Sequence, residues 1–393
     1  MSQRLSHAES ARRHLSLNKI PVSLGERSYE IVIGHGILSD LGNAISRLGL
    51  GPRQMIVTSE TLWPLYGKTV HDSLASSGFD VSVAFVRDDE ESKSLQTVTS
   101  IYDNLLESEF DRSSGIVAVG GGVVGDVAGF AAATFMRGIP FVQVPTTLLA
   151  QVDSSIGGKT GVNYPKAKNL VGAFHQPTAV WTDISTLVTL PERELRSGLA
   201  EVIKYAIIAD QNLFTMLERI LSSFSNASSD TLIEVVSRCC SIKARIVEQD
   251  ERERGIRSIL NYGHTVGHAL EALTGYAYYT HGEAVAIGMV AAAKISREIH
   301  ATHQDTVKMQ ESLVEAAGLP TRIERPIDPY DIVQQLSRDK KRLAGRVRWV
   351  LPRTVGEVFL TDEVPSDVVL GILKDMTTSR EVEAHCGRRS VFR

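Results

Sequence analysis

Short β-branched runs alternate with helical patterns through the first half of the chain, and the alternation ends near residue 183. The strand-like runs are IPVSL, YEIVIG, MIVTS, VSVAFV, GIVAVGGG, FVQVPTT and AVWTD. Strands separated by helical segments form βαβ units and build a mostly parallel sheet. Residues 19–185 are therefore predicted to form a doubly wound α/β domain of the type that binds nucleotides.

The second half is almost entirely helical. Six helical segments follow Leu190 and Pro191, and one predicted hairpin, RVRWVLP to GEVFL, interrupts them. Residues 186–376 are predicted to form an α-helical domain packed on the first, and a length of 393 residues suits such a division. A ligand is expected in the cleft between the two domains.

Both ends of the chain are predicted to be loose tails. Residues 1–18 contain no apolar segment of the secretory type. Their Arg/Ser bias is compatible with a transit peptide, but a disordered extension is the favoured interpretation. Residues 377–393 show no sustained helical periodicity and are interpreted in the same way.

Composition excludes several classes of partner. A net charge of −4 gives no general attraction to nucleic acid or to anionic lipid. The longest apolar run, Ala284 to Ala293, is about half of the ~20 residues that a membrane-spanning helix needs. The three cysteines form neither a disulfide framework nor a metal knuckle. A cytoplasmic protein that binds neither membranes nor nucleic acid is expected.

A glycine-rich loop follows the run GIVAVG and opens a helix. Gly120, Gly122 and Gly125 have the G-x-G-x-x-G spacing that lets backbone N–H groups approach a pyrophosphate. The match is incomplete, because earlier strands precede the loop and no acid for a ribose hydroxyl follows about 20 residues later. A purely structural turn is the alternative, but three successive glycines exceed what a turn needs.

The stretch TTLLAQVDSSIGGKTGVN, residues 146–163, is polar and glycine-rich and predicts a long irregular loop. It is not a Walker A loop, because Asp153 stands where the first glycine belongs. Lys159, Lys168 and Asn169 could each be ordinary surface residues. Their proximity in sequence to Arg137 and to the glycine loop favours an anion site.

Three candidate metal ligands lie in the helical half: Glu201, His264 and His281. Two imidazoles and one carboxylate with an open position are typical of a catalytic zinc site, which acts as a Lewis acid. Any one of these histidines, taken alone, is more often a structural residue, so the prediction depends on the set.

His264 and His268 are four residues apart and face the same side of a helix. A zincin motif would need Glu at position 265, where Thr stands, so a metalloprotease is excluded. Further basic residues are individually typical of solvated helix faces and gain meaning only if they converge on one anion. They are Lys204, Lys243, Arg257, Lys340, Lys341 and Arg342.

With these residues in place, the chain resembles the 3-dehydroquinate synthases from about Tyr29 to about Glu357. The blocks that carry the resemblance occur in the family's order and spacing. They are GGGVVGDVAGFAAATFMRG, VPTTLLAQVDSSIGGKTGVN, KNLVGAFHQP, LPERELRSGLAEVIKY, LNYGHTVGHALE and HGEAVAIGM.

The resemblance implies NAD and one divalent metal ion, zinc or cobalt, as cofactors. The implied NAD contacts are Glu90, Lys93, Gly121, Gly122, Asp126, Thr146, Thr147, Asp153, Lys159, Lys168 and Thr189. The implied metal ligands are Glu201, His264 and His281, with His268 on the substrate side. Ser59 stands where the family commonly has an acid for the adenosine ribose, and Tyr164–Ala167 replaces a more usual His-Pro-x-Gly.

The resemblance also implies the substrate contacts. The implied catalytic residues are Lys159, Lys204, Lys243, Glu253, Arg257, Asn261 and His268. The implied substrate-binding residues are Arg137, Asp153, Lys168, Asn169, Lys340 and Lys341. The scattered cations thereby acquire one common task, and a homodimer is the implied assembly.

The implied reaction converts 3-deoxy-D-arabino-heptulosonate 7-phosphate to 3-dehydroquinate and phosphate. It proceeds by transient oxidation with NAD, phosphate elimination, reduction and intramolecular aldol closure, and it is the second step of the shikimate pathway. Alternatives are a sister sugar-phosphate cyclase, a metal-dependent polyol dehydrogenase and a non-catalytic scaffold of the same fold. Arg257, Asn261 and His268 favour the dehydroquinate branch.

Overall fold

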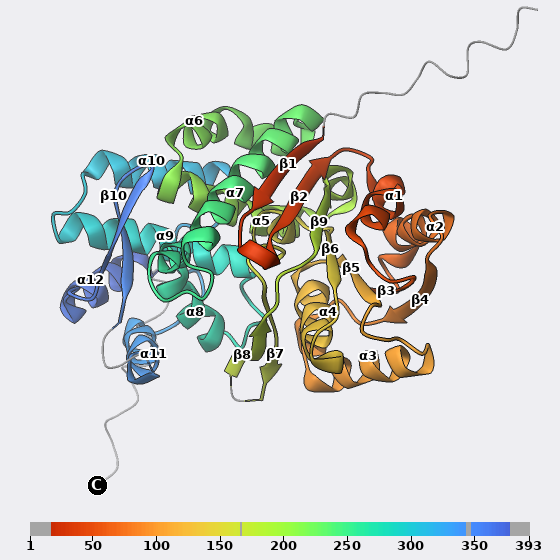
Figure 1. Ribbon diagram of the computed structural model, residues 1–393. Coiled ribbons are helices and arrows are strands. Elements are labelled where there is room, and N and C mark those ends of the chain that lie inside the picture. Colours follow the sequence, from red (N-terminus) through yellow and green to blue (C-terminus); the bar gives the residue numbers. More distant parts are fainter. Residues whose placement is uncertain (1–16, 166, 343–346, 378–393) are drawn as a thin grey trace, which may run out of the picture. The chain divides into compact units, whose positions relative to one another are not determined.

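The computed structural model describes residues 17–165, 167–342 and 347–377, and the predicted tails lie almost wholly outside these ranges. The described chain divides into two compact units (Figure 1). The first contains residues up to 146 together with 154–188 and 228–240; the second contains 147–153, 189–227 and 241 onward. Segment 147–153 thus belongs to the second unit and segment 228–240 to the first. The sequence-based division between residues 185 and 186 placed each of them in the other domain.

The first unit is built on a seven-stranded sheet with the order β1-β2-β9-β6-β5-β3-β4. Every neighbouring pair is parallel except β1 and β2, which are antiparallel. The strands are β1 (Asn18–Val22), β2 (Tyr29–Gly34), β3 (Arg53–Thr58), β4 (Asp80–Phe85), β5 (Gly115–Gly120), β6 (Phe141–Pro145) and β9 (Ala179–Asp183). The predicted doubly wound sheet is confirmed.

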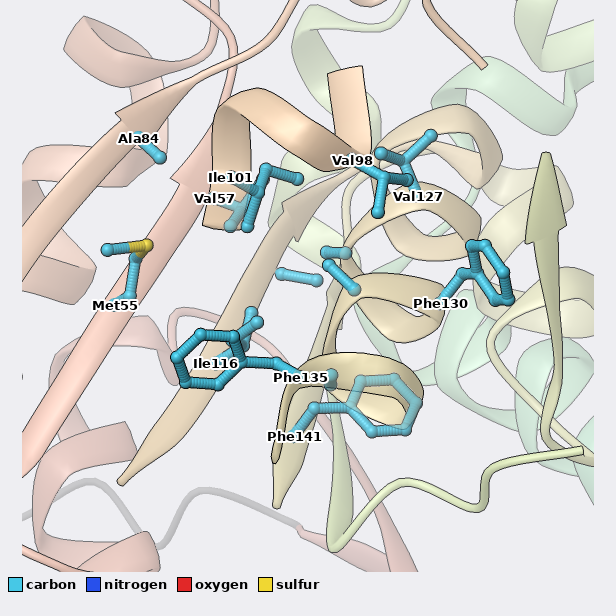
Figure 2. Packing of buried hydrophobic residues seen from close by; sticks show 14 of the residues in the cluster. Met55, Val57, Ala84, Val98, Ile101, Ile116, Val127, Phe130, Phe135 and Phe141 are labelled. Atoms are coloured by element: carbon cyan, nitrogen blue, oxygen red, sulfur yellow. The ribbon is translucent and has the colours of Figure 1, made fainter. Parts of the chain in front are cut away.

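Helices cover both faces of this sheet, because alternate strand residues point to opposite sides. They are α1 (Leu41–Ile45), α2 (Lys68–Ser76), α3 (Leu95–Glu107) and α4 (Gly122–Thr134). Met55 and Val57 of β3 pack with α3 and α4, as Figure 2 shows, whereas Ile56 packs with α1 and α2. The near-continuous apolar strands follow from this burial on both faces.

The prediction of an irregular loop over residues 146–163 was wrong for its last part, which belongs to a β-ribbon. The ribbon is antiparallel and consists of two strands, β7 (Lys159–Tyr164) and β8 (Ala167–Phe174), preceded by a π-helical turn at Ala150–Ser154. Gly161 and Gly172 face each other across the ribbon, and a Cβ on Gly172 would lie 2.2 Å from the Thr160 carbonyl oxygen. These glycines are therefore needed for close strand approach, whereas the predicted irregular loop included Gly161 as a loop residue.

The second unit is mostly helical, as predicted, and includes the predicted hairpin. Its helices are α5 (Glu192–Ala209), α6 (Gln211–Ile220), α8 (His264–Leu273), α9 (His281–Glu298), α10 (Gln304–Ala316), α11 (Pro329–Arg342) and α12 (Ser366–Met376). The hairpin is β10 (Trp349–Thr354) and β11 (Glu357–Thr361). Helix α7 (Ser229–Gln249) begins in the first unit and ends in the second.

Helix α9 is the central element of the second unit. It packs against α5, α8, α10, α12 and β10. The apolar run Ala284–Ala293 forms its buried middle, which explains why this helix is apolar on every side. Among the described residues, no helix combines the length and hydropathy that crossing a membrane would require.

Candidate metal and substrate site

Glu201, His264 and His281 meet in the second unit. Glu201 lies within α5, and the two histidines are the first residues of α8 and α9. One ligand atom from each lies within 4.8 Å of the other two. The Nε2 atoms of His264 and His281 are 3.6 and 3.5 Å from Oε1 of Glu201.

Glycines allow the three helices to approach closely enough to form this group. A Cβ on Gly288 of α9 would lie 1.8 Å from the carbonyl oxygen of Gly263, the residue before α8. A Cβ on Gly282 would lie 2.1 Å from the Ser197 carbonyl oxygen on α5. Thr280 and Glu283 form a capping box that begins α9 at His281.

Nδ1, the ring nitrogen that points away from Glu201, has a partner in each histidine, and this contact orients the ring. Nδ1 of His264 lies 3.0 Å from the carbonyl oxygen of Tyr262. Nδ1 of His281 lies 3.5 Å from Oε1 of Glu271 on α8. The two Nε2 atoms are therefore directed toward Glu201.

Burial and neighbouring charges shift the protonation equilibria of the three residues. Burial lowers the pKa of His264 to about 3. Burial also opposes the charge on His281, but the nearby carboxylates of Glu201 and Glu271 raise its pKa to about 10. Burial opposes the charge on Glu201 as well. The positive charge of Lys204 outweighs this effect of burial and lowers the pKa of Glu201 to about 2. Glu201 is therefore a permanent carboxylate at neutral pH.

A buried ionic network adjoins the group. Lys204 pairs with Oε2 of Glu201 and lies 3.7 Å from Oδ1 of Asp153. Lys243 donates to the same Oδ1 at 2.8 Å, and the Tyr205 hydroxyl donates to it at 2.5 Å. Glu201 and Asp153 outweigh burial and raise the pKa of Lys204, whereas burial lowers the pKa of Lys243 to about 8.

The segment after α7 carries three further predicted residues. The Asn261 side chain donates to Oε1 of Glu253 at 2.9 Å, and Glu253 has a left-handed backbone with φ of 55°. Arg257 is buried, and its guanidinium donates to the carbonyl oxygen of Glu251. Asp250 accepts the backbone N–H groups of Arg254, Gly255 and Arg257 and thereby organises the segment.

His268 lies on the same face of α8 as His264, one turn further on. Their ring centroids are 5.2 Å apart, and the His268 and His281 centroids are 6.3 Å apart. His268 is exposed and is not part of the group of three ligand atoms.

The predicted phosphate loop lies at the carboxyl end of β5. Gly121 is the N-cap of α4, and the Thr146 N–H after β6 donates to the Gly120 carbonyl oxygen at 3.0 Å. Several glycines there also serve packing, since a Cβ on Gly125 would lie 2.7 Å from the Gln143 side chain. Both the functional and the structural interpretation of the loop therefore have a physical basis.

Four predicted nucleotide contacts form two ion pairs in the first unit. Lys93 is buried and pairs with Asp126 of α4. Lys168 pairs with Glu90 at 3.1 Å. Asn163 connects Glu90 with Asn169, another predicted residue. Its side chain donates to Oε1 of Glu90 at 2.8 Å and accepts the Asn169 N–H at 2.9 Å.

The remaining predicted residues are distributed over both units. Lys159 begins β7 and is exposed, and Arg137 is exposed in the turn after α4. The Thr147 hydroxyl accepts the Ala150 N–H, and Thr189 is exposed at the end of a 3₁₀ turn. Lys340 and Lys341 lie in the last turn of α11, where the side chains are outside the described residues.

The structure thus brings the predicted residues together in two groups. The second unit joins Asp153, Glu201, Lys204, Lys243, His264 and His281, and it pairs Glu253 with Asn261. The first unit pairs Lys93 with Asp126 and Glu90 with Lys168. Glu271, Tyr205, Asp250 and Asn163 were not predicted. Of these four, only Glu271 could have been predicted from the sequence, because it lies seven residues after His264 and hence on the same helix face.

Fold and site define a class: a doubly wound α/β unit with a glycine-rich phosphate-type loop, joined to a helical unit with a candidate catalytic metal centre. Comparison with known proteins is more specific. The family model described as the N-terminal part of 3-dehydroquinate synthase matches residues 83–197, and the model of the C-terminal part matches residues 198–342. The chain belongs to the 3-dehydroquinate synthase family.

Curated relatives agree over nearly the whole length. The 3-dehydroquinate synthase of Desulforamulus reducens is 48% identical over 357 residues, which cover 91% of this chain and 99% of the relative. That of Nostoc punctiforme is 48% identical over 359 residues, with the same coverage.

Solved structures share the fold. A 2-epi-5-epi-valiolone synthase from Streptomyces hygroscopicus subsp. jinggangensis, with NAD⁺ and Zn²⁺ bound, has a TM-score of 0.83 at 27% identity, covering 90% of this chain and 98% of its own. A 2-deoxy-scyllo-inosose synthase complexed with carbaglucose-6-phosphate, NAD⁺ and Co²⁺ has a TM-score of 0.83 at 29% identity, covering 91% of this chain and all of its own. Glycerol dehydrogenase from Schizosaccharomyces pombe, at 15% identity, a TM-score of 0.63 and 88% coverage of each chain, shares the fold alone.

Proposed function

We propose that the site around Glu201 catalyses the reaction of the chain's family. It converts 3-deoxy-D-arabino-heptulosonate 7-phosphate to 3-dehydroquinate and phosphate, with a divalent metal ion and NAD as cofactors. The observation that carries this proposal is the group of Glu201, His264 and His281 beside two buried lysines, in a chain 48% identical to named 3-dehydroquinate synthases.

The donor set fits a divalent zinc or cobalt ion. One carboxylate and two imidazole nitrogens leave coordination positions open for substrate. Both carboxylate oxygens of Glu201 are buried and accept no hydrogen bond of ordinary geometry within the described residues. When bound, the metal ion lowers the pKa of a substrate hydroxyl, and NAD takes up and returns the hydride.

The buried network holds positive charge beside the metal ligands. Lys204 keeps its proton because Glu201 and Asp153 are both close. The pKa of Lys243, about 8, is closer to neutral pH, so Lys243 is suited to exchange a proton with the substrate. Asp153 fixes the position of both ammonium groups by accepting from Lys243 and facing Lys204.

The segment 250–261 provides the remaining polar groups of the second unit. Arg257 supplies a buried, permanently charged donor for a substrate carboxylate or hydroxyl. Glu253, held by Asn261, supplies a carboxylate acceptor. His268 is not one of the three candidate metal ligands, and we assign it to the substrate side as an acid or base.

Residues of the first unit hold the nucleotide and contribute to phosphate binding. The N–H groups at the start of α4 are suited to a pyrophosphate, and Lys93 with Asp126 lies beside them. Lys159, Lys168, Asn169 and Arg137 are assigned to the anionic groups of substrate and cofactor, as are Lys340 and Lys341 of the second unit. Elimination requires a leaving phosphate held by such cations, with the phosphate itself as a possible base.

A sister sugar-phosphate cyclase is the second candidate, since two such enzymes share this fold with TM-scores of 0.83. Zinc-loaded protein with catalytic NAD is therefore offered 3-deoxy-D-arabino-heptulosonate 7-phosphate, and phosphate release and absorbance at 340 nm are followed together. Phosphate and 3-dehydroquinate without accumulating NADH are expected. Release from a different sugar phosphate alone would assign a sister cyclase, and net NADH formation from a polyol would assign a dehydrogenase. Glu201→Gln is the inactive control.

We also propose a homodimer that works in the cytoplasm. Sedimentation equilibrium is expected to give twice the chain mass of 42.9 kDa. A single-chain mass at micromolar concentration would contradict this assembly.

A further inference from the structure

Glu271 is a buried carboxylate to which the metal-site prediction gave no role. It lies on α8, seven residues after His264, and its side chain is 10% exposed. Burying a carboxylate is unfavourable unless a charged or hydrogen-bonding partner compensates. Its Oε1 lies 3.5 Å from Nδ1 of His281, the ring nitrogen directed away from Glu201.

The helix pair holds this contact in place. Gly267 of α8 lies against α9, where an added Cβ would be 3.1 Å from the Ala284 carbonyl oxygen, and Gly288 meets Gly263. Because α8 and α9 touch through glycines, Glu271 and the first turn of α9 cannot separate without loss of packing.

The two histidines differ in how their outer nitrogens are held. Nδ1 of His264 faces a backbone carbonyl oxygen, which no side-chain substitution removes. Nδ1 of His281 faces a side chain. A carboxylate that accepts the Nδ1 proton fixes the tautomer whose Nε2 lone pair is available to a metal, and it raises the basicity of the ligand.

We propose that Glu271 is the positioning residue for His281: its carboxylate accepts the Nδ1 proton and directs Nε2 toward the metal position between Glu201 and His264. This inference rests on the proposed function, because it assigns an outer partner to one ligand of the proposed metal site. Glu271 acts through His281 and contacts neither metal nor substrate.

The test is zinc affinity, measured by competition with a chelator of known affinity. Glu271→Gln keeps the size of the side chain and one acceptor oxygen but removes the charge, and Glu271→Ala removes both. Loss of such an outer partner weakens metal binding by about 10–100-fold, so we expect Glu271→Gln near the lower limit and Glu271→Ala near the upper. Glu298→Gln, the same change at an exposed site near the end of α9, is expected to bind zinc as the wild type does.

A second readout separates positioning from general support of the fold. The visible absorption spectrum of the Co²⁺ form reports ligand geometry and is expected to change in both Glu271 variants and not in Glu298→Gln. Thermal unfolding of the metal-free proteins shows which variants are folded, and Glu271→Gln keeps the test usable if Glu271→Ala unfolds.

Wild-type zinc affinity and a wild-type Co²⁺ spectrum in folded Glu271→Gln and Glu271→Ala would overturn this inference and leave the proposed function intact. Failure of the wild-type chain to bind zinc or cobalt would overturn the proposed function, and this inference with it.

Discussion

His264 and His268 lie one turn apart on α8 but occupy different positions relative to the ligand group. His264→Ala removes one of three ligand atoms, so the zinc content is expected to fall from one per chain to near zero. His268→Ala is expected to keep the zinc and to lose turnover by about 100-fold or more, as removal of an acid or base does. Metal analysis and phosphate-release assays on both purified variants check this, and loss of zinc from the His268 variant would contradict the assignment.

Lys243 makes stability depend on pH in a predictable direction. Burial lowers its pKa to about 8, below the ordinary value of 10.5, so between these values the unfolded chain binds more protons than the folded chain. The contribution of Lys243 to the free energy of unfolding therefore increases with pH from about 8 to 10.5, with a slope of up to ~1.4 kcal/mol per pH unit.

Urea unfolding of the metal-free protein at several pH values measures this slope. Lys243→Met has no ammonium group to titrate and is expected to show a slope smaller by up to that amount. Equal slopes in the two proteins would mean that Lys243 titrates normally.

Residue types predicted the candidate metal ligands but not the residues that contact them. Glu201, His264 and His281 could be selected because two imidazoles and a carboxylate are a recognisable donor set. Tyr205 and Asn163 could not be selected, because each acts through a contact distant in sequence, to Asp153 and to Glu90. A tyrosine in a helical pattern and an asparagine in a strand carry no local sign of the partner that each contacts.

At the scale of elements, the contact between α8 and α9 sets the distance between His264 and His281. Gly288→Ala would place a Cβ 1.8 Å from the Gly263 carbonyl oxygen and push the helices apart. Overpacking of this kind lowers the free energy of unfolding by about 1–3 kcal/mol, and zinc affinity is expected to fall with it. Chemical denaturation and chelator competition measure the two effects.

Gly371→Ala is the matched control, because a Cβ at this position of α12 meets no atom within 4 Å. It is expected to raise the free energy of unfolding by up to ~1 kcal/mol and to leave zinc affinity unchanged. Equal effects of the two substitutions would show that helix contact does not set the site.

Asp250 controls the segment that carries Glu253 and Arg257. Asp250→Ala removes the acceptor for three backbone N–H groups, so the segment is expected to lose its fixed conformation. We expect KM for the sugar phosphate to rise by about 10-fold or more while zinc content stays at one per chain. Steady-state kinetics with metal analysis checks this, and an unchanged KM would show that the segment is held by other contacts.

The elements themselves were largely predictable, with one instructive exception. The continuously buried run of β3, packed on both faces of the sheet, and the apolar run of α9 give clear patterns because tertiary packing and local sequence agree there. The β7–β8 ribbon was missed because Gly161 and Gly172 weaken the strand pattern. The reason for these glycines, close approach across the ribbon, appears only once the two strands are paired.

At the scale of the whole molecule, the order of strands and helices predicted an α/β unit and a helical unit. It did not predict that segments 147–153 and 228–240 each belong to the other unit. Residues 147–153 follow β6 directly and yet belong to the helical unit, where Asp153 meets Lys204 and Lys243. Sequence patterns describe continuous stretches, whereas compact units are defined by contacts between distant ones. The site in the second unit depends on segment 147–153, because this segment supplies Asp153.

We propose that Glu201, His264 and His281 hold a metal ion that turnover requires. The most direct measurement is anomalous diffraction at the zinc absorption edge from crystals of the zinc-loaded, active protein. We predict one strong peak bounded by the Glu201 carboxylate and the Nε2 atoms of His264 and His281. A peak held by other residues, or active crystals without a peak at this position, would show that these three residues do not hold the metal ion that turnover requires.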